Sequence, residues 1–358
     1  MVPLRVAVVG VGAFGRNHLR VYRELEAAHP GLVSLVAIVE KDAITREAAA
    51  ARLGLPAYGS VQELLASPQR PDAASICVPT IHHAAVAEIL LQNGVDVLIE
   101  KPFASTLAEA DRVLELAQQH GRILQIGHLE RFNPAVTATM KRLNRPMFFE
   151  AHRLSIFTPR SLDVDVVLDL MIHDLDIVLA LTNSPVREVR AVGLPILSRK
   201  VDIANVRIEF DSGCVANFTA SRVSTEQVRK IRLFQPRQYI SIDFARQEVL
   251  SIDVDPTRAG PSASFMAGDS VTTGQPASWS SIVRAPTVTI PHPSAGLSLD
   301  KYDLIKAEPL RLELEDFITS CRERTQPRVP GEAGIAALAL ALEINQRIAA
   351  HTKRAGLV

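Results

Sequence analysis

The chain has 358 residues, of which 47% are hydrophobic and 22% charged, a composition typical of a globular protein with more than one core. Its 39 basic residues balance 39 acidic ones, which argues against nucleic acid as a partner. Three scattered cysteines suggest neither a disulfide framework nor a metal site. We expect no bound metal, no export signal and no membrane-spanning segment, and therefore a cytoplasmic protein.

Short apolar runs alternate with helical patterns over the first part of the chain. The apolar runs predict strands at 4–9, 32–39, 74–78, 95–99 and 123–127, and apolar spacing predicts helices at 16–28, 43–53, 81–92 and 107–120. Such alternation is typical of a doubly wound parallel sheet. We therefore predict an α/β Rossmann domain over residues 1–127.

A glycine-rich turn follows the first predicted strand. Residues 10–15 read Gly-Val-Gly-Ala-Phe-Gly and lead directly into a predicted helix. In this motif Gly10 permits a tight turn, Gly12 lets the backbone approach a pyrophosphate, and Gly15 allows close packing of helix on strand. Because the phosphates would lie at the positive end of the helix, the pattern predicts a dinucleotide site.

The second predicted strand ends at Glu40. An acidic side chain at this place accepts hydrogen bonds from the adenosine ribose, and its charge repels a 2′-phosphate. This favours NAD over NADP, although Lys41 next to it weakens the preference. A solvated acidic turn is the alternative interpretation.

After about residue 146 the pattern changes, and we predict that residues 128–358 form an α+β domain with a large, mostly antiparallel open sheet. An apolar helix is predicted at 166–181, and period-two alternation predicts strands near 205–210, 214–220, 231–234, 239–244 and 248–252. Residues 255–300, rich in Pro, Gly, Ser and Thr, are interpreted as a long hairpin or excursion. Helices are predicted at 310–324 and 333–350, and we expect them to pack back on the first domain.

Asp169 and His173 are four residues apart on the apolar helix, so they share one face. Buried polar groups are costly unless they are paired or face a cleft, so the pair is either an internal hydrogen bond or a catalytic pair. In a catalytic pair, an imidazole suits the role of a general base that removes a proton. In the catalytic interpretation His173 is the base and Asp169 orients it.

Several motifs occur together in order along the chain: the glycine turn, Pro79-Thr80-Ile81-His82-His83, Glu100-Lys101-Pro102, and the segment from Asp169 to His173. With them the chain resembles the glucose–fructose oxidoreductase/inositol dehydrogenase/rhizopine-catabolism (Gfo/Idh/MocA) family over essentially its whole length. The resemblance implies NAD as cofactor and Lys101, Asp169 and His173 as catalytic residues. It further implies cofactor contacts from a set of positions in the first domain: Gly10, Gly12, Ala13, Phe14, Gly15, Glu40, Pro79, Thr80, His83, Glu100 and Lys101.

Lys101 follows a predicted parallel strand at the edge where such sheets bind ligands. An ammonium there can stabilise an alkoxide, or it can act as the base if burial lowers its pKa. The sequence leaves the choice between Lys101 and His173 open. For His82 and His83, contact with the cofactor and a helix-capping role are the two interpretations.

Three stretches, 127–135, 150–154 and 166–179, are similar to family members that oxidise the 3-hydroxyl of UDP-N-acetylglucosamine. The similarity implies a nucleotide-sugar substrate and, in some pathways, an aminotransferase that leads to lipid A. Residues proposed to bind the substrate are His128, Arg131, Asn133, Arg153, Arg160 and His173. His128, Arg131 and Asn133 are alternatively a polar hinge. Arg153, Arg160 and Arg222 suit a diphosphate but are alternatively surface charges.

Two other functions compete with this expectation: a dehydrogenase of a free sugar or polyol, and an NAD(H)-binding regulator without catalysis. The resemblance also implies a homodimer or homotetramer formed through the open sheet face.

Overall fold

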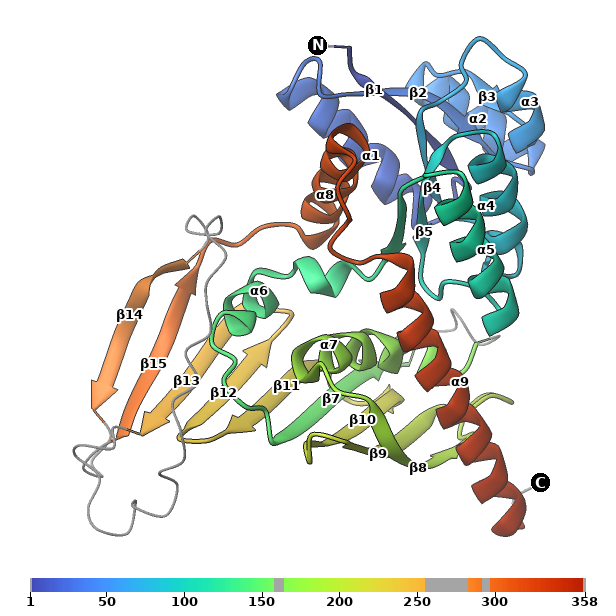
Figure 1. Ribbon diagram of the computed structural model, residues 1–358. Coiled ribbons are helices and arrows are strands. Elements are labelled where there is room, and N and C mark those ends of the chain that lie inside the picture. The colour runs from blue at the N-terminus through green and yellow to red at the C-terminus, as the bar shows by residue number, and fades with distance from the viewer. Residues whose placement is uncertain (1, 158–163, 255–282, 292–296, 357–358) are drawn as a thin grey trace. The chain divides into compact units, whose positions relative to one another are not determined.

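The computed structural model describes residues 2–157, 164–254, 283–291 and 297–356 (Figure 1). The chain divides into two compact units. The first contains Met1–Phe132 and Glu308–Ala339, and the second contains Asn133–Ala307 and Leu340–Val358. The sequence placed the boundary after residue 127, whereas here the first unit continues to residue 132 and takes in part of the C-terminal region.

The first unit is built on six parallel strands in the order β3-β2-β1-β4-β5-β6. This order reverses between β1 and β4, which is where doubly wound sheets bind dinucleotides. The strands are β1 (Leu4–Val9), β2 (Val33–Val39), β3 (Ala57–Tyr58), β4 (Ala73–Ile76), β5 (Asp96–Glu100) and β6 (Leu124–Gly127). The predicted parallel sheet is confirmed, and β3 is an addition that the sequence analysis missed.

Helices connect these strands and cover the sheet. They are α1 (Gly15–Ala28), α2 (Ala43–Leu53), α3 (Val61–Leu65), η1 (Thr80–His82), α4 (His83–Gln92), α5 (Leu107–Gln119), η2 (Leu129–Phe132) and α8 (Pro309–Glu323). Helix α8 packs against α1, and α4 packs against α5. In Figure 1, α1 and α8 lie together on one side of the sheet, with α4 and α5 on the other.

Helix α8 completes the hydrophobic core of the first unit. Leu314, Phe317 and Ile318 are fully buried in one cluster with the apolar residues of α1, β1 and β2. Burial of each such side chain contributes about 1.5–3 kcal/mol. The edge strand β6 is also covered from this region, because the Ile126 N–H donates to the Val329 carbonyl at 3.0 Å.

The second unit contains a nine-stranded mixed sheet with the order β14-β15-β13-β12-β11-β7-β10-β9-β8. Only the β7–β10 pair is parallel among the pairs described. The strands are β7 (Phe148–Ile156), β8 (Val186–Leu194), β9 (Ile203–Phe210), β10 (Val215–Ser224), β11 (Val228–Gln235), β12 (Gln238–Asp243), β13 (Glu248–Val254), β14 (Val283–Pro291) and β15 (Leu297–Leu304). Part of the predicted 255–300 hairpin is therefore the β14–β15 pair; residues 255–282 and 292–296 lie outside the described residues.

Alternation along the strands gives this sheet one buried face. In β9, Ala204, Val206 and Ile208 are buried, whereas Asn205 and Arg207 between them are exposed. The buried face carries the helices of this unit, and Figure 1 shows α6 (Pro134–Met140) and α7 (Ile172–Thr182) on the same side of the sheet.

Helix α9 (Gly331–Arg354) begins in the first unit and ends in the second. By length and composition alone it is long and apolar enough to cross a membrane. Core helices pass the same test, and several of its apolar side chains are buried, among them Ala341, Ile344 and Ile348. The feature alone is weak evidence for a membrane span.

Candidate active site

The three glycines of the turn after β1 have three different environments. Gly10 has a φ of +89°, and a Cβ there would lie 2.8 Å from the Cys77 carbonyl group. A Cβ on Gly15 would lie 1.9 Å from the Gly10 carbonyl oxygen, so helix α1 can approach the turn only without a side chain at this position. At Gly12 nothing lies within 4 Å of a Cβ. This is open space where a pyrophosphate can approach the backbone.

The amino end of α1 is suited to an anion. Its N-cap residue, Phe14, makes no side-chain cap hydrogen bond, and its first turn has no acidic residue. Gly12, Ala13 and Phe14 are exposed, whereas Gly15 is buried against the strand. Backbone N–H groups and the helix dipole therefore offer a site for phosphate oxygens, and this cradle fits a dinucleotide.

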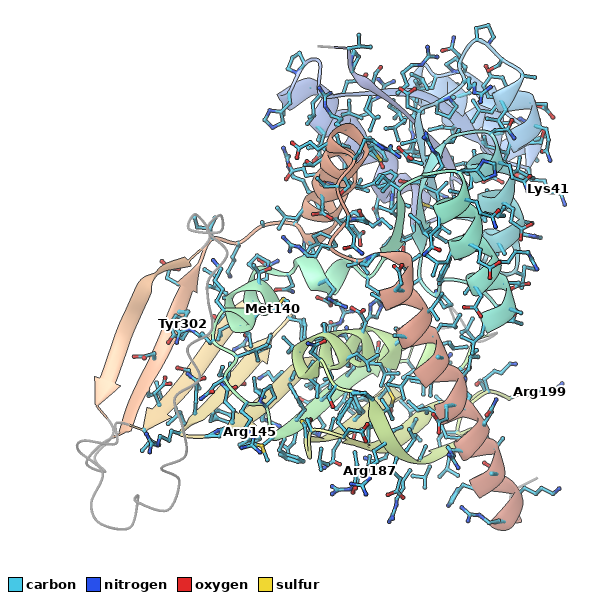
Figure 2. All side chains as sticks on the ribbon, viewed as in Figure 1. Lys41, Met140, Arg145, Arg187, Arg199 and Tyr302 are labelled. Carbon is cyan, nitrogen blue, oxygen red and sulfur yellow. The ribbon has the colours of Figure 1, made fainter. Side chains whose placement is uncertain are left out.

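Glu40 is fixed beside this turn by backbone hydrogen bonds. Its Oε2 accepts the Val11 N–H at 2.9 Å, and its Oε1 accepts the Asp42 N–H at 3.1 Å. Lys41 is exposed at the outer surface of the unit (Figure 2). The turn is further held by Arg46, which donates to the Glu40 carbonyl at 2.9 Å. The carboxylate therefore stands at the place where a ribose hydroxyl is recognised in NAD sites.

Strand β4 ends near the same point and leads into Pro79, Thr80 and η1. Pro79 is exposed and Thr80 half-buried, so both are accessible to a cofactor. His83 is 1% exposed, and its Nε2 lies 2.9 Å from the Val78 carbonyl oxygen while its Nδ1 lies 3.0 Å from that of Pro102. His83 thus joins the segment after β4 to the segment after Lys101. Its predicted direct contact with the cofactor finds no support in these contacts.

Glu100 and His18 form a buried contact that sequence analysis missed. His18 Nε2, on the buried face of α1, lies 2.9 Å from Glu100 Oε1 at the end of β5. A Cβ on Gly127 would lie 2.9 Å from the same carboxyl group, so glycine is needed on the neighbouring strand. The pair joins the helix of the phosphate turn to the strand that carries Lys101. In the sequence, this contact is indicated only by a histidine among the apolar positions of the helix at 15–28.

Lys101 directly follows β5, and its side chain is half-buried. It lies at the carboxyl edge of the parallel sheet, as predicted, on a strand two places from β1 in the sheet order. Strand position therefore brings the phosphate turn, the segment after β4 and Lys101 to one edge of the first unit.

The segment after β6 carries the next three predicted residues. His128 is 1% exposed, and Arg131 is half-buried in η2. Asn133 is the N-cap of α6: its side chain accepts the Ala135 N–H at 3.1 Å and donates to the Phe244 carbonyl at 3.1 Å. The contacts of Asn133 are thus those of a helix cap, and its role in substrate binding stays a prediction.

In the second unit, Asp169 and His173 lie on a helical segment that differs from the prediction. Instead of one α-helix, residues Val167–Met171 form a π-helical turn, η3, which continues into α7. Asp169 belongs to the π turn and His173 to α7; both are half-buried, whereas Val166, Val167 and Ile172 are fully buried. The two polar side chains are thus on the more accessible face of an apolar helix, and π turns are frequent at functional sites.

The arginines expected to hold a diphosphate have other partners. Arg153 is 3% exposed and forms a forked ion pair with Asp174, with bonds of 3.0 and 2.7 Å. Arg222 is also buried, and its Nε lies 3.6 Å from Asp202 Oδ1. Neither is a surface charge, and the described ion pairs give both a structural role. Arg160 lies outside the described residues.

No group of three or more metal-ligating side chains occurs in the described part of the chain. The geometry of the first unit defines a class, that of Rossmann dinucleotide-binding domains.

Comparison with known proteins identifies the family. Residues 4–128 match the model described as the Gfo/Idh/MocA oxidoreductase family with an NAD-binding Rossmann fold, and residues 135–239 match that of the Gfo/Idh/MocA C-terminal domain. The chain belongs to this family of oxidoreductases, and its cofactor is NAD.

Two relatives bear on its chemistry. UDP-N-acetylglucosamine 3-dehydrogenase from Acidithiobacillus ferrooxidans is 35% identical over 99% of this chain and 100% of its own length. A solved structure of that enzyme has a TM-score of 0.81, at 34% identity, and covers 98% of this chain and 99% of its own. The scyllo-inositol 2-dehydrogenase (NAD(+)) of Bacillus subtilis is 28% identical over 62% of this chain and 68% of its own length.

Proposed function

We propose that the protein oxidises the 3-hydroxyl of UDP-N-acetylglucosamine with NAD. The observation that carries the proposal is the 35% identity to a UDP-N-acetylglucosamine 3-dehydrogenase along the full length of both chains. A likeness restricted to the Rossmann domain would support only the cofactor, whereas this one includes the unit that carries Asp169 and His173.

In the proposed reaction, bound NAD supplies the acceptor of the hydride that leaves the sugar C3. The protein must remove the hydroxyl proton and stabilise the developing alkoxide. We assign the proton to His173, with Asp169 orienting the imidazole, and the alkoxide to the Lys101 ammonium. If Lys101 is the base instead, the same single proton passes from the sugar hydroxyl to a side chain.

The 3-keto product is a substrate for reductive amination. We propose that an aminotransferase consumes it to make a 3-amino sugar for lipid A. Removal of the ketone by such a step would draw an otherwise unfavourable alcohol oxidation forward.

A free polyol is the second candidate substrate, since the chain is also similar to an inositol dehydrogenase. The test is growth of absorbance at 340 nm with NAD and, in turn, UDP-N-acetylglucosamine, N-acetylglucosamine and scyllo-inositol, each with a ketone trap. We expect turnover with the nucleotide sugar and at least a hundredfold lower kcat/KM without the UDP group. Turnover only with free sugars or polyols would contradict the proposal, and silence with every alcohol would favour a regulator.

We also propose that the protein is a homo-oligomer formed through the face of the nine-stranded sheet opposite α6 and α7. Support comes from an aromatic row there: the ring centroids of Phe148 and Phe234 are 5.5 Å apart, and those of Phe234 and Tyr239 are 5.0 Å apart. Phe234 is 36% exposed. Partly exposed aromatic side chains on one face are typical of protein–protein interfaces.

A further inference from the structure

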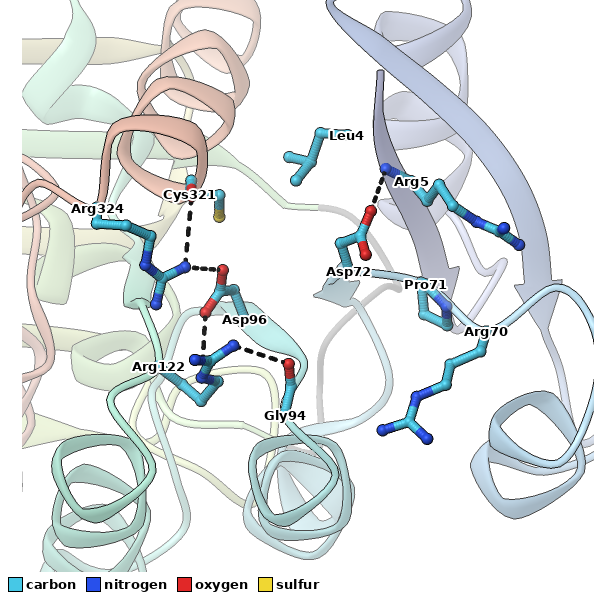
Figure 3. Close-up of a pocket in the computed structure, with 10 residues that line it drawn as sticks. All are labelled: Leu4, Arg5, Arg70, Pro71, Asp72, Gly94, Asp96, Arg122, Cys321 and Arg324. Carbon is cyan, nitrogen blue, oxygen red and sulfur yellow. Dashed lines mark hydrogen bonds and ion pairs between the residues drawn. The ribbon is translucent and has the colours of Figure 1, made fainter. Parts of the chain in front are cut away.

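A pocket lies in the first unit, at the sheet edge opposite the phosphate turn (Figure 3). Its volume is about 320 Å³. Its lining comes from the amino ends of the strands: Arg5 lies near the start of β1, Asp72 precedes β4, Asp96 begins β5, and Arg122 precedes β6. Since Gly10 and Lys101 follow the carboxyl ends of these strands, the pocket is separate from the dinucleotide site.

Two arginines of this pocket hold the turn between α4 and β5. Arg70 donates from Nη2 to the Asn93 carbonyl, and Arg122 donates from Nη1 to the Gly94 carbonyl at 3.0 Å. These are consecutive carbonyls of the turn between α4 and β5, so both arginines hold the same turn, and Figure 3 shows Gly94 between their side chains.

Arg324, like Arg122, holds the turn that precedes β6. It donates from Nη2 to the Gly121 carbonyl at 2.6 Å, and Arg122 donates from Nε to the preceding carbonyl, that of His120, at 3.0 Å. The Asp96 carboxylate lies between the two arginines: Oδ2 accepts from Arg324 Nη1 at 2.5 Å, and Oδ1 is 3.9 Å from Arg122 Nε. Figure 3 shows the Asp96 carboxylate between Arg324 and Arg122.

The arginines of the pocket outnumber its carboxylates. Asp72 accepts the backbone N–H of Arg5 at 3.0 Å, and the Arg5 guanidinium donates to the Pro68 carbonyl at 2.8 Å. Arg5 Nε is buried with no hydrogen-bond partner. Four arginines and two aspartates line the pocket, which leaves two positive charges in excess. Each guanidinium has five N–H donors, so donors remain for a ligand.

We propose that this pocket binds a small phosphate-type dianion. The charge of a dianion matches the excess, and guanidinium forks suit phosphate oxygens. The donors come from separate segments, around residues 70, 122 and 324, so a tetrahedral anion with oxygens in several directions fits them better than a planar carboxylate. The volume leaves room for a small organic group beside Leu4, Pro71 and Cys321. Burial raises the pKa of the Cys321 thiol, which therefore stays neutral beside an anion.

The test uses the full chain saturated with NAD, so that the phosphate turn is occupied. Inorganic phosphate, glycerol 3-phosphate and malonate are each titrated by calorimetry at constant ionic strength. We expect one site per chain with a Kd of about 1 mM or tighter for a phosphate probe, and weaker binding of malonate. If glycerol 3-phosphate binds more tightly than inorganic phosphate, the preferred ligand is a phosphomonoester. If the two bind equally, the preferred ligand is free phosphate.

Arg70→Gln should weaken phosphate binding by about tenfold, because it removes a charged donor from an exposed position without touching the core. The matched control is Arg112→Gln, an exposed arginine that donates to Glu88 at 2.5 Å away from the pocket, and it should leave binding unchanged. Absence of a saturable site, equal effects of both substitutions, or malonate binding as tight as phosphate would overturn the proposal. The outcome is independent of which sugar the enzyme oxidises.

Discussion

The Glu40 carboxylate is held in place by the N–H groups of Val11 and Asp42. Such preorganisation lowers the cost of ordering the side chain when the ribose binds. The same negative charge makes a 2′-phosphate unfavourable at this position, so one side chain serves both affinity and selectivity.

Glu40→Ser should weaken NADH binding by about tenfold, because it removes a charged hydrogen-bond acceptor for the ribose. NADPH binding should be unchanged or tighter, since the repulsion of its phosphate is relieved. Both are measured by nicotinamide fluorescence titration. Asp42→Ser is the control, because Asp42 caps α2 by accepting the Thr45 N–H at 2.8 Å and serine can do the same. Equal weakening of NADH and NADPH would contradict the selectivity argument.

Lys101→Met should leave NADH affinity within about twofold and lower kcat by at least a hundredfold, since the ammonium acts on the reacting oxygen rather than on the cofactor phosphates. NADH affinity is measured by fluorescence titration. The kcat is measured by absorbance at 340 nm, with the substrate that this absorbance assay has identified. Lys306→Met changes an exposed lysine and should alter neither quantity. Undiminished turnover would remove Lys101 from the mechanism.

At the scale of elements, His83 connects the start of α4 to the segment that follows Lys101. Burial lowers the pKa of this imidazole below its ordinary value of 6.5. Hydrogen bonds to backbone carbonyls raise the pKa, but their effect is smaller than that of burial. The folded protein thus binds a proton at His83 less readily than the unfolded chain does. The contribution to stability is present above about pH 6.5 and is lost as the pH falls below it.

The free energy of unfolding should therefore decrease between pH 7.5 and pH 5.5, and His83→Gln should remove part of that decrease. Urea unfolding at both pH values, for the wild type and the variant, measures the difference. His82→Gln changes the exposed neighbour and should retain the wild-type dependence. An identical pH dependence in all three proteins would show that His83 does not carry it.

The sequence predicted the helices and strands of the first unit well because their periodicity is local. The helix at 43–53 has the predicted bounds, and β2, β5 and β6 differ from prediction at one or both ends by a residue. The short β3 and α3, and the strands β7 and β8, were missed. A two-residue strand has no periodicity to detect, and the pairing of β7 with β10 joins segments far apart in sequence.

Charged pairs inside the molecule were harder to predict than its elements. The contacts of His18 with Glu100 and of Arg153 with Asp174 join residues 82 and 21 positions apart. Only the fold brings these partners together, so the sequence could not distinguish Arg153 in a buried ion pair from Arg153 in a phosphate site. The glycine turn, Glu40 and Lys101 were predictable because each follows the end of a recognisable strand.

At the scale of the whole molecule, the aromatic row on the open sheet face should determine the oligomeric state. Phe234→Lys places a charge at its centre and should shift the protein toward monomer by at least tenfold in dissociation constant, because the interface would have to bury an unpaired ammonium. Sedimentation velocity over a concentration series measures the shift. Ile44→Lys, on a side chain 80% exposed in α2, is the control. A monomeric wild type would contradict the proposed interface.

The late position of α8 in the chain affects how the protein can be made. The core of the first unit includes Leu314, Phe317 and Ile318, so a ribosome must synthesise most of the chain before that core is complete. At about 5–20 residues per second, the nascent Rossmann segment waits many seconds with one apolar surface uncovered. That surface is a natural binding site for a chaperone during translation. Expression of residues 1–132 alone would leave the same surface permanently exposed and should yield aggregates rather than a small NAD-binding protein.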